Sequence, residues 1–209
     1  MADLPFQLPA PLAVRLRAAA DVEGKLPRAL LALGLPAAGE VGLLDDPEGW
    51  GAVRLREHGA AVRSLPPADP LLLDVPDGSL DAIVSLWSGF RVVDPTALVE
   101  VDRALRDDGR LLVVHDYGRD DVCALRPADA PEYTTWSRRD GPFLRGGFRI
   151  HVVHCFWTFP SVEDGRAFLA EAFGPGGQAL ADDLRRPRLS WNVAIYHRAR
   201  GGAASAGMP

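Results

Sequence analysis

Residues 69–116 give the clearest indication of the fold, and they read DPLLLDVPDGSLDAIVSLWSGFRVVDPTALVEVDRALRDDGRLLVVHD. It contains two strand-like apolar runs, Asp81–Trp87 and Leu111–Val114, with a segment of helical pattern, Pro95–Arg106, between them. The continuous apolar residues of the first run are typical of a strand that is buried on both faces of a sheet. The order strand, helix, strand therefore predicts two parallel strands of an α/β sheet.

The helix between the two strands carries start and stop signals. Asp94 is a suitable N-cap, and Pro95 fits the first helical turn, where a missing backbone N–H costs nothing. Gly109 is expected to end the helix. The apolar positions expected on its buried face are Leu98, Val101 and Leu105.

The flanking sequence extends the same alternation of strands and helices. Upstream, the pattern predicts two short helices within Leu12–Leu33, broken at Gly24 and Pro27, then a strand Glu40–Leu44, a helix Glu48–Glu57 ending at Gly59, and a strand Ala60–Leu65. Downstream, it predicts a strand Phe148–Phe159, a helix Ser161–Phe173 capped by Ser161, and a final strand Leu189–His197. The predicted fold class is α/β, a Rossmann-like doubly wound, mostly parallel sheet with an antiparallel closing strand.

The block around residues 69–116 resembles the class I S-adenosylmethionine-dependent methyltransferases. The motifs that carry the resemblance are, in chain order, Asp69, Pro76-Asp77-Gly78-Ser79, Leu80-Asp81, Glu100-x-x-Arg103-x-Leu105 and Asp108-Gly109, followed by the strand Arg110–Asp116. The similarity covers about residues 40–116 and is weaker through the last strand near residue 197. It implies S-adenosylmethionine as cofactor and transfer of its methyl group to a small-molecule substrate.

The loop after the first strand departs from the family's glycine-rich pattern. The resemblance implies that Asp45, Gly49 and Gly51 bind the cofactor, but Pro47 stands where the family has its first glycine. Proline removes a backbone donor and fixes φ near −65°, whereas glycine permits a tight turn and close approach of a ligand. We expect this change to cost on the order of 1–3 kcal/mol of cofactor affinity.

The same half of the chain is also short. Between Gly51 and Asp69 the family fits two strands and a helix, and here one strand–helix unit is missing, so either Ala60–Leu65 is strand two and strand three is lost, or the reverse. That strand ends in Ser64-Leu65, without the acid that the family uses to bind the ribose hydroxyls. Asp69 aligns with the family's acid near the adenine.

Trp87 and His115 end two predicted neighbouring strands at one edge of the sheet. The resemblance places Trp87 where an indole would stack on the adenine or the substrate, and the alternative is an ordinary core residue. His115 is a candidate catalytic general base for an O- or N-methylation, because histidine titrates near neutral pH. The alternative for His115 is a hydrogen-bonded structural residue.

Composition restricts the partners and the compartment. The chain has 209 residues, a formal net charge of −5 and a pI near 5.5, so neither nucleic acid nor a membrane surface is an expected partner. It contains no apolar run of the roughly 20 residues that span a bilayer and no signal-peptide pattern, so a cytoplasmic location is expected. The two cysteines, Cys123 and Cys155, and the pair His151 and His154, predicted to lie on opposite faces of a strand, do not suggest a metal site.

The expected organisation is one methyltransferase-like domain, residues 40–198, with N-terminal helices in 1–39 packed on it and a flexible tail, 199–209. Residues 119–147, rich in arginine and aromatic side chains, form a possible lid over the sheet edge. Two functions stay open. One is an S-adenosylmethionine-dependent methyltransferase that acts on a small molecule. The other is a catalytically silent protein of the same fold that serves as a binding or assembly module.

Overall fold

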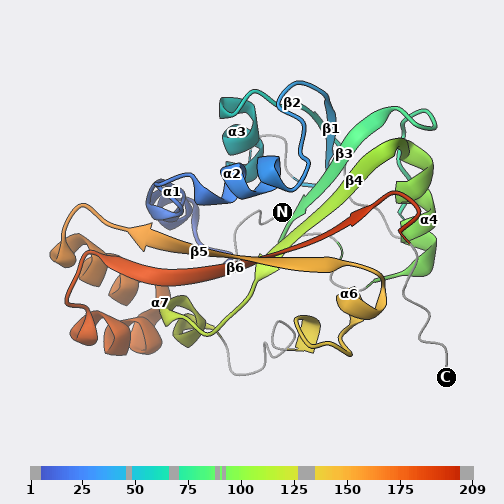
Figure 1. The fold of residues 1–209 in the computed structure, drawn as a ribbon. Helices are drawn as coiled ribbons and strands as arrows, with labels where there is room; N and C mark the ends of the chain where they lie inside the picture. Colours follow the sequence, from blue (N-terminus) through green and yellow to red (C-terminus); the bar gives the residue numbers. More distant parts are fainter. Residues whose placement is uncertain are drawn as a thin grey trace.

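The computed structural model describes residues 6–45, 49–65, 71–87, 90, 93–126 and 135–202. Its strands form one six-stranded sheet in the order β2-β1-β3-β4-β6-β5 (Figure 1). The strands are β1 (Glu40–Leu43), β2 (Ala61–Ser64), β3 (Leu80–Leu86), β4 (Leu105–Asp116), β5 (Arg149–Thr158) and β6 (Arg188–Ala199). Strands β2, β1, β3 and β4 pair in parallel, and β6 is antiparallel to both β4 and β5. The predicted fold class, with its antiparallel closing strand, is confirmed.

Helices cover both faces of the sheet. They are α1 (Ala10–Ala19), α2 (Lys25–Ala32), α3 (Trp50–Glu57), α4 (Pro95–Ala104), α6 (Pro142–Arg145) and α7 (Val162–Asp183), together with a short 3-10 helix, η1 (Asp121–Leu125). Buried residues of α1, α2, α3 and α7 share one hydrophobic core, and those of α4 and α6 share another. We name the two sides of the sheet the α1 face and the α4 face after these cores.

The alternation along β4 shows how one strand serves both cores. Leu112 and Val114 belong to the core on the α1 face, whereas Leu111 and Val113 belong to the core on the α4 face. All four side chains are fully buried, because successive residues of a strand point to opposite faces and both faces are covered.

Helix α4 begins as predicted and ends earlier. The carboxylate of Asp94 accepts a hydrogen bond from the backbone N–H of Thr96 at 3.0 Å, and Pro95 occupies the first turn. The helix stops at Ala104, because Leu105 has an extended backbone and pairs with Leu80 of β3. The prediction that Gly109 ends the helix is therefore wrong.

The N-terminal and C-terminal helices match the predicted pattern with one difference each. Gly24, with φ of 64°, separates α1 from α2 as predicted, but Pro27 lies inside α2 and does not break it. Ser161 caps α7 through a 3.0 Å hydrogen bond from the N–H of Asp164. The helix predicted to end at Phe173 kinks at Gly174 and then continues to Asp183.

The shortening of the sheet is confirmed, and its location is defined. Between β1 and β3, the described residues contain only α3 and β2, and β2 pairs directly with β1. In the common doubly wound order, strand two lies beside strand one and strand three lies outside it. The missing unit is therefore the one that includes strand three. The strand order reverses between β1 and β3, which is the switch point where ligands of such sheets bind.

The domain limits proposed from the sequence stay predictions. Helices α1 and α2 pack on the α1 face of the same sheet, and β6 continues to Ala199. Parts of the predicted lid and tail, residues 127–134 and 203–209, lie outside the described residues.

Candidate functional site

The carboxyl ends of β1, β3 and β4 lie at the switch point, and Asp45 is the first predicted site residue there. Its side chain is buried, and Oδ2 accepts a 2.6 Å hydrogen bond from the backbone N–H of Leu86 at the end of β3. Its backbone oxygen accepts a hydrogen bond from Ser64 Oγ at 3.1 Å. Asp45 therefore joins the ends of three strands.

Gly49 and Gly51 lie at the start of α3. Gly49 is the N-cap residue, with an extended backbone. Gly51 faces β3, where a Cβ atom on it would lie 1.9 Å from Cδ1 of Leu86. The absence of a side chain at Gly51 lets α3 approach the sheet, which is the helix-packing role of a third glycine in a dinucleotide-type loop. Pro47 lies outside the described residues.

Trp87 lies immediately after β3 and is fully buried, with a φ of 59° that is rare for an aromatic residue. Its indole N–H donates to Asp116 Oδ1 at 3.0 Å. The indole of Trp191, from β6, donates to the same oxygen at 3.0 Å and stacks on Trp87 with 5.4 Å between ring centroids. Trp50 of α3 contacts both rings at their edges.

Asp116 is the centre of this group, which we call the Trp–Asp cluster: Trp50, Trp87, Asp116, Arg126 and Trp191. Asp116 ends β4 on the α1 face and is 2% exposed. Its second carboxylate oxygen pairs with the guanidinium of Arg126, which also lies over the ring of Phe6. The carboxylate is thus matched by two N–H donors and one cation, as a buried charge must be.

His115 precedes Asp116 but points to the other side of the sheet. It is fully buried on the α4 face, 4.5 Å from the ring of Trp136 and 5.9 Å from that of Phe143 between centroids. Its Nε2 lies 3.3 Å from the backbone oxygen of Phe90. His115 and Asp116 therefore share the sheet edge without sharing a site, and the role of His115 as a base stays a prediction.

The remaining predicted cofactor residue, Asp69, lies outside the described residues. The described end of β2 contains Ser64 and Leu65, without an acid for the ribose hydroxyls.

Two acids beyond β4 attach the following loop to the sheet. Asp121 Oδ2 accepts from the backbone N–H and the hydroxyl of Ser190, at 2.8 and 2.7 Å. Asp120 accepts from the backbone N–H of Asn192 at 2.7 Å, and burial raises the pKa of its carboxyl. This turn, which suggests no chemistry in the sequence, fixes η1 beside the Trp–Asp cluster.

Sequence reasoning missed Trp50, Trp191 and Arg126 as partners of Asp116. The residues of the cluster are spread from position 50 to position 191, and only the pairing of β4 with β6 brings them together. A usable signal was the placement of Asp116 and Trp191 near the ends of two strands that the fold class predicts to be antiparallel neighbours.

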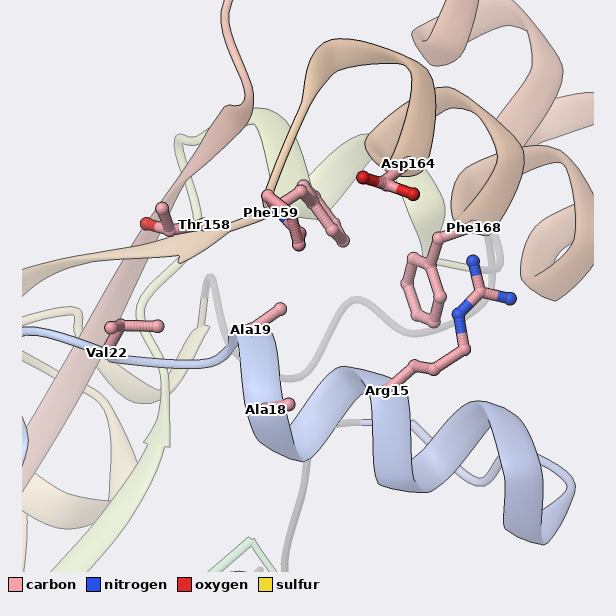
Figure 2. Close-up of a pocket in the computed structure, with 9 residues that line it drawn as sticks. Arg15, Ala18, Ala19, Val22, Thr158, Phe159, Asp164 and Phe168 are labelled. Carbon is pink, nitrogen blue, oxygen red and sulfur yellow. The ribbon is translucent and has the colours of Figure 1, made fainter.

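A groove of about 420 Å³ lies elsewhere on the α1 face, between α1, the end of β5 and the start of α7 (Figure 2). Its wall is mainly apolar and includes Ala19, Phe159 and Phe168. The two charged side chains at it are already engaged: Arg15 pairs with Glu171 at 2.6 Å, and Asp164 accepts from the hydroxyl of Ser161 at 2.9 Å.

Within the described ranges, no group of three or more His, Cys, Asp or Glu side chains is arranged to hold a metal ion. None of the helices in that same part of the chain is both long enough and apolar enough to cross a membrane.

No protein-family model matches the sequence, and no curated protein does either. Solved structures do match. A candidate type II methyltransferase from Anaeromyxobacter dehalogenans superposes with a TM-score of 0.52, over 84% of this chain and 95% of its own, at 16% identity. The chain therefore has the fold of the class I S-adenosylmethionine-dependent methyltransferases, and at this identity the likeness concerns the fold alone.

Two further structures are similar at lower scores. A candidate methyltransferase in complex with the Haloferax volcanii Trm112 activator has a TM-score of 0.49 and 15% identity, over 82% of this chain and 88% of its own. A geranyl diphosphate C-methyltransferase from Streptomyces coelicolor has a TM-score of 0.42 and 14% identity, over 86% and 81%.

Proposed function

We propose that this chain is a catalytically silent protein of the methyltransferase fold, which does not hold S-adenosylmethionine in the usual pose and serves as a binding or assembly module. The Trp–Asp cluster carries this proposal. At the sheet end where ligands of this fold class bind, Trp87 and Trp191 are fully buried and stacked on each other. An indole that is stacked within the protein cannot also stack on an adenine with the same face.

Asp45 supports the same proposal. Its Oδ2 accepts from the backbone of Leu86 at the end of β3, so this carboxylate oxygen is engaged within the protein. The contact of Gly51 with Leu86 fits either function, because a cofactor-binding loop of this class also brings its helix close to the sheet through a glycine. The engaged carboxylate and the buried indoles together support a protein that does not hold the cofactor in its usual pose.

A binding role needs a place for a ligand, and the groove of Figure 2 is one candidate. Its volume, about 420 Å³, lies within the roughly 300–1,000 Å³ of small-molecule sites. Because its wall is mainly apolar, and Arg15 and Asp164 already bind Glu171 and Ser161, a small and mainly apolar molecule is the class of ligand that suits it.

Isothermal titration with S-adenosylmethionine and S-adenosylhomocysteine, after removal of any co-purified ligand, tests the proposal. We expect no binding at millimolar ligand. Micromolar binding would overturn the silent assignment. Gly49→Val is the control for a positive result, because a side chain there would occupy backbone space at the start of α3, and unchanged affinity would place the ligand elsewhere.

The second candidate is an S-adenosylmethionine-dependent methyltransferase that acts on a small molecule. One observation favours it: the indole N–H of Trp50, in the first turn of α3 at the switch point, is buried and has no hydrogen-bond partner within the described part of the chain. A ligand with an acceptor that reaches this indole would satisfy the donor. If titration detects cofactor, His115→Ala should lower turnover more than cofactor affinity, and equal turnover would remove His115 from the reaction.

A further inference from the structure

A second cavity lies at the opposite end of the sheet. The amino ends of β4 and β5 and the carboxyl end of β6 contribute to a cavity of about 500 Å³. Its wall includes the charged or titratable residues Arg110, Arg149, His197 and Arg198. Among the described residues that line it, none is acidic.

Strand register places three of these residues on one face. His197 of β6 pairs with Arg149 of β5 on one side and with Leu112 of β4 on the other. Arg110 is two residues from Leu112, so it has the same orientation. Arg110, Arg149 and His197 therefore project from three adjacent strands toward the α1 face.

The stem of Arg110 occupies a space that Gly34 leaves free. A Cβ atom on Gly34, just after α2, would lie 2.4 Å from Cδ of Arg110, and Gly34 also has a φ of 103° that favours glycine. The guanidinium of Arg110 is thus positioned by packing and not by an ion pair.

Four arginines of β6, α4 and their adjoining residues are matched by carboxylates. Arg198 donates to Asp102 at 2.6 Å and Arg200 to Asp107 at 2.5 Å. Arg103 pairs with Glu100 and Asp77, and Arg106 pairs with Asp81. Across the described ranges, by contrast, neither Arg110 nor Arg149 has an ion pair with an acid. Two such cations beside a histidine create a local positive potential that attracts an anion.

The pKa of His197 is affected by this local charge. Burial first, then Arg110, Arg149 and His151, lower the pKa of its imidazole. The positive potential is therefore local, since the chain as a whole has a net charge of −5.

We propose that this cavity binds the phosphate group of a small phosphomonoester, held by Arg110, Arg149 and His197. Guanidinium groups suit phosphate oxygens through charge-assisted, bidentate hydrogen bonds. The cavity is larger than a phosphate ion requires, which leaves room for the body of the ester. This inference does not depend on the proposed function. The cavity lies at the amino ends of the parallel strands, whereas the switch point and the start of α3 lie at their carboxyl ends.

Titration with inorganic phosphate and with phenyl phosphate at low ionic strength tests the site. We expect saturable binding of both, tighter for phenyl phosphate. Arg110→Gln and Arg149→Gln should each weaken it about tenfold or more, because each removes charge-assisted hydrogen bonds. Arg200→Gln is the matched control, since Arg200 is partly exposed, paired with Asp107 and outside the cavity wall.

A second readout is the pKa of His197, measured by NMR. Bound phosphate should raise it in the wild type and much less in the two arginine variants, with thermal unfolding used to confirm that these variants are folded. Absence of saturable binding, or equal binding by Arg110→Gln and Arg149→Gln, would overturn the site. Acetate that binds as well as phosphate would overturn the assignment to phosphate, and weaker binding of phenyl phosphate than of phosphate would overturn the assignment to a monoester.

Discussion

The two ends of the sheet differ in whether their charged side chains have partners of opposite charge. At the carboxyl end of β4, Asp116 is buried and matched by Trp87, Trp191 and Arg126. At the amino ends of β4 and β5, Arg110 and Arg149 lie beside His197 without a carboxylate. The topology of an open α/β sheet says where a ligand is expected, but the side chains decide whether that place is available.

The strongest test of this contrast is Asp116→Ala. It would leave two indole N–H groups and the guanidinium of Arg126 buried without their acceptor. We expect a loss of about 3–5 kcal/mol in the free energy of unfolding, measured by urea denaturation. Asp107→Ala is the control, because it removes an exposed carboxylate and should cost about 1 kcal/mol or less. Similar costs for both variants would mean that the cluster is not a structural unit.

Gly51→Ala tests whether Gly51 serves the packing of α3 on the sheet or leaves space for a ligand. The new methyl group would collide with Leu86, so we expect a loss of about 1–3 kcal/mol in the free energy of unfolding. Gly176→Ala in α7 meets open space and should instead stabilise by up to about 1 kcal/mol. If Gly51→Ala leaves stability unchanged, the space beside it is available to a ligand, which would favour the enzyme.

At the amino end of the sheet, the lowered pKa of His197 should make the stability of the protein depend on pH. The folded pKa of His197 is lowered below its ordinary value of 6.5, so protonation favours the unfolded chain and stability falls as pH falls through this range. We expect the loss between about pH 7.5 and about pH 5.5 to be smaller in His197→Gln than in the wild type. Phosphate should reduce the loss in the wild type, and identical pH profiles for the two proteins would contradict the local positive potential.

The smallest expected effect is that of Arg149→Gln on stability. Because this arginine has no ion pair with an acid in the described part of the chain, its removal should change the free energy of unfolding by about 0.5 kcal/mol or less. Arg103→Gln breaks contacts with Glu100, Asp77 and two backbone oxygens and should cost clearly more. A large loss for Arg149→Gln would assign that residue to the fold and not to a ligand.

Much of the fold could be predicted from the sequence because its signals are local. The strand that ends near Trp87, the cap at Asp94 and the cap at Ser161 depend on residues a few positions apart. The early end of α4 could not be predicted, because pairing of Leu105 with Leu80 competes with a helical pattern that would otherwise continue.

The site was less predictable because its contacts are distant in sequence. Asp45, Gly49, Gly51 and Trp87 lie near the switch point, but their local patterns do not reveal which partner each one takes. The separation of His115 from Asp116 follows from the alternation of a strand, which the sequence already contained. The meeting of Asp116 with Trp191 needed the pairing of β4 with β6.

The shortened sheet also has a consequence for self-association. It makes β2 one of the two outermost strands of the sheet, and among the described residues no further strand pairs with its outer edge. An open strand edge is a place where another chain can pair. This strand has only four residues and carries Arg63, whose guanidinium is held by the backbone oxygen of Asp74 at 2.8 Å. A short edge strand that carries a charge disfavours edge-to-edge pairing with a strand of another molecule, so these features offset the exposure that follows from the missing outer strand.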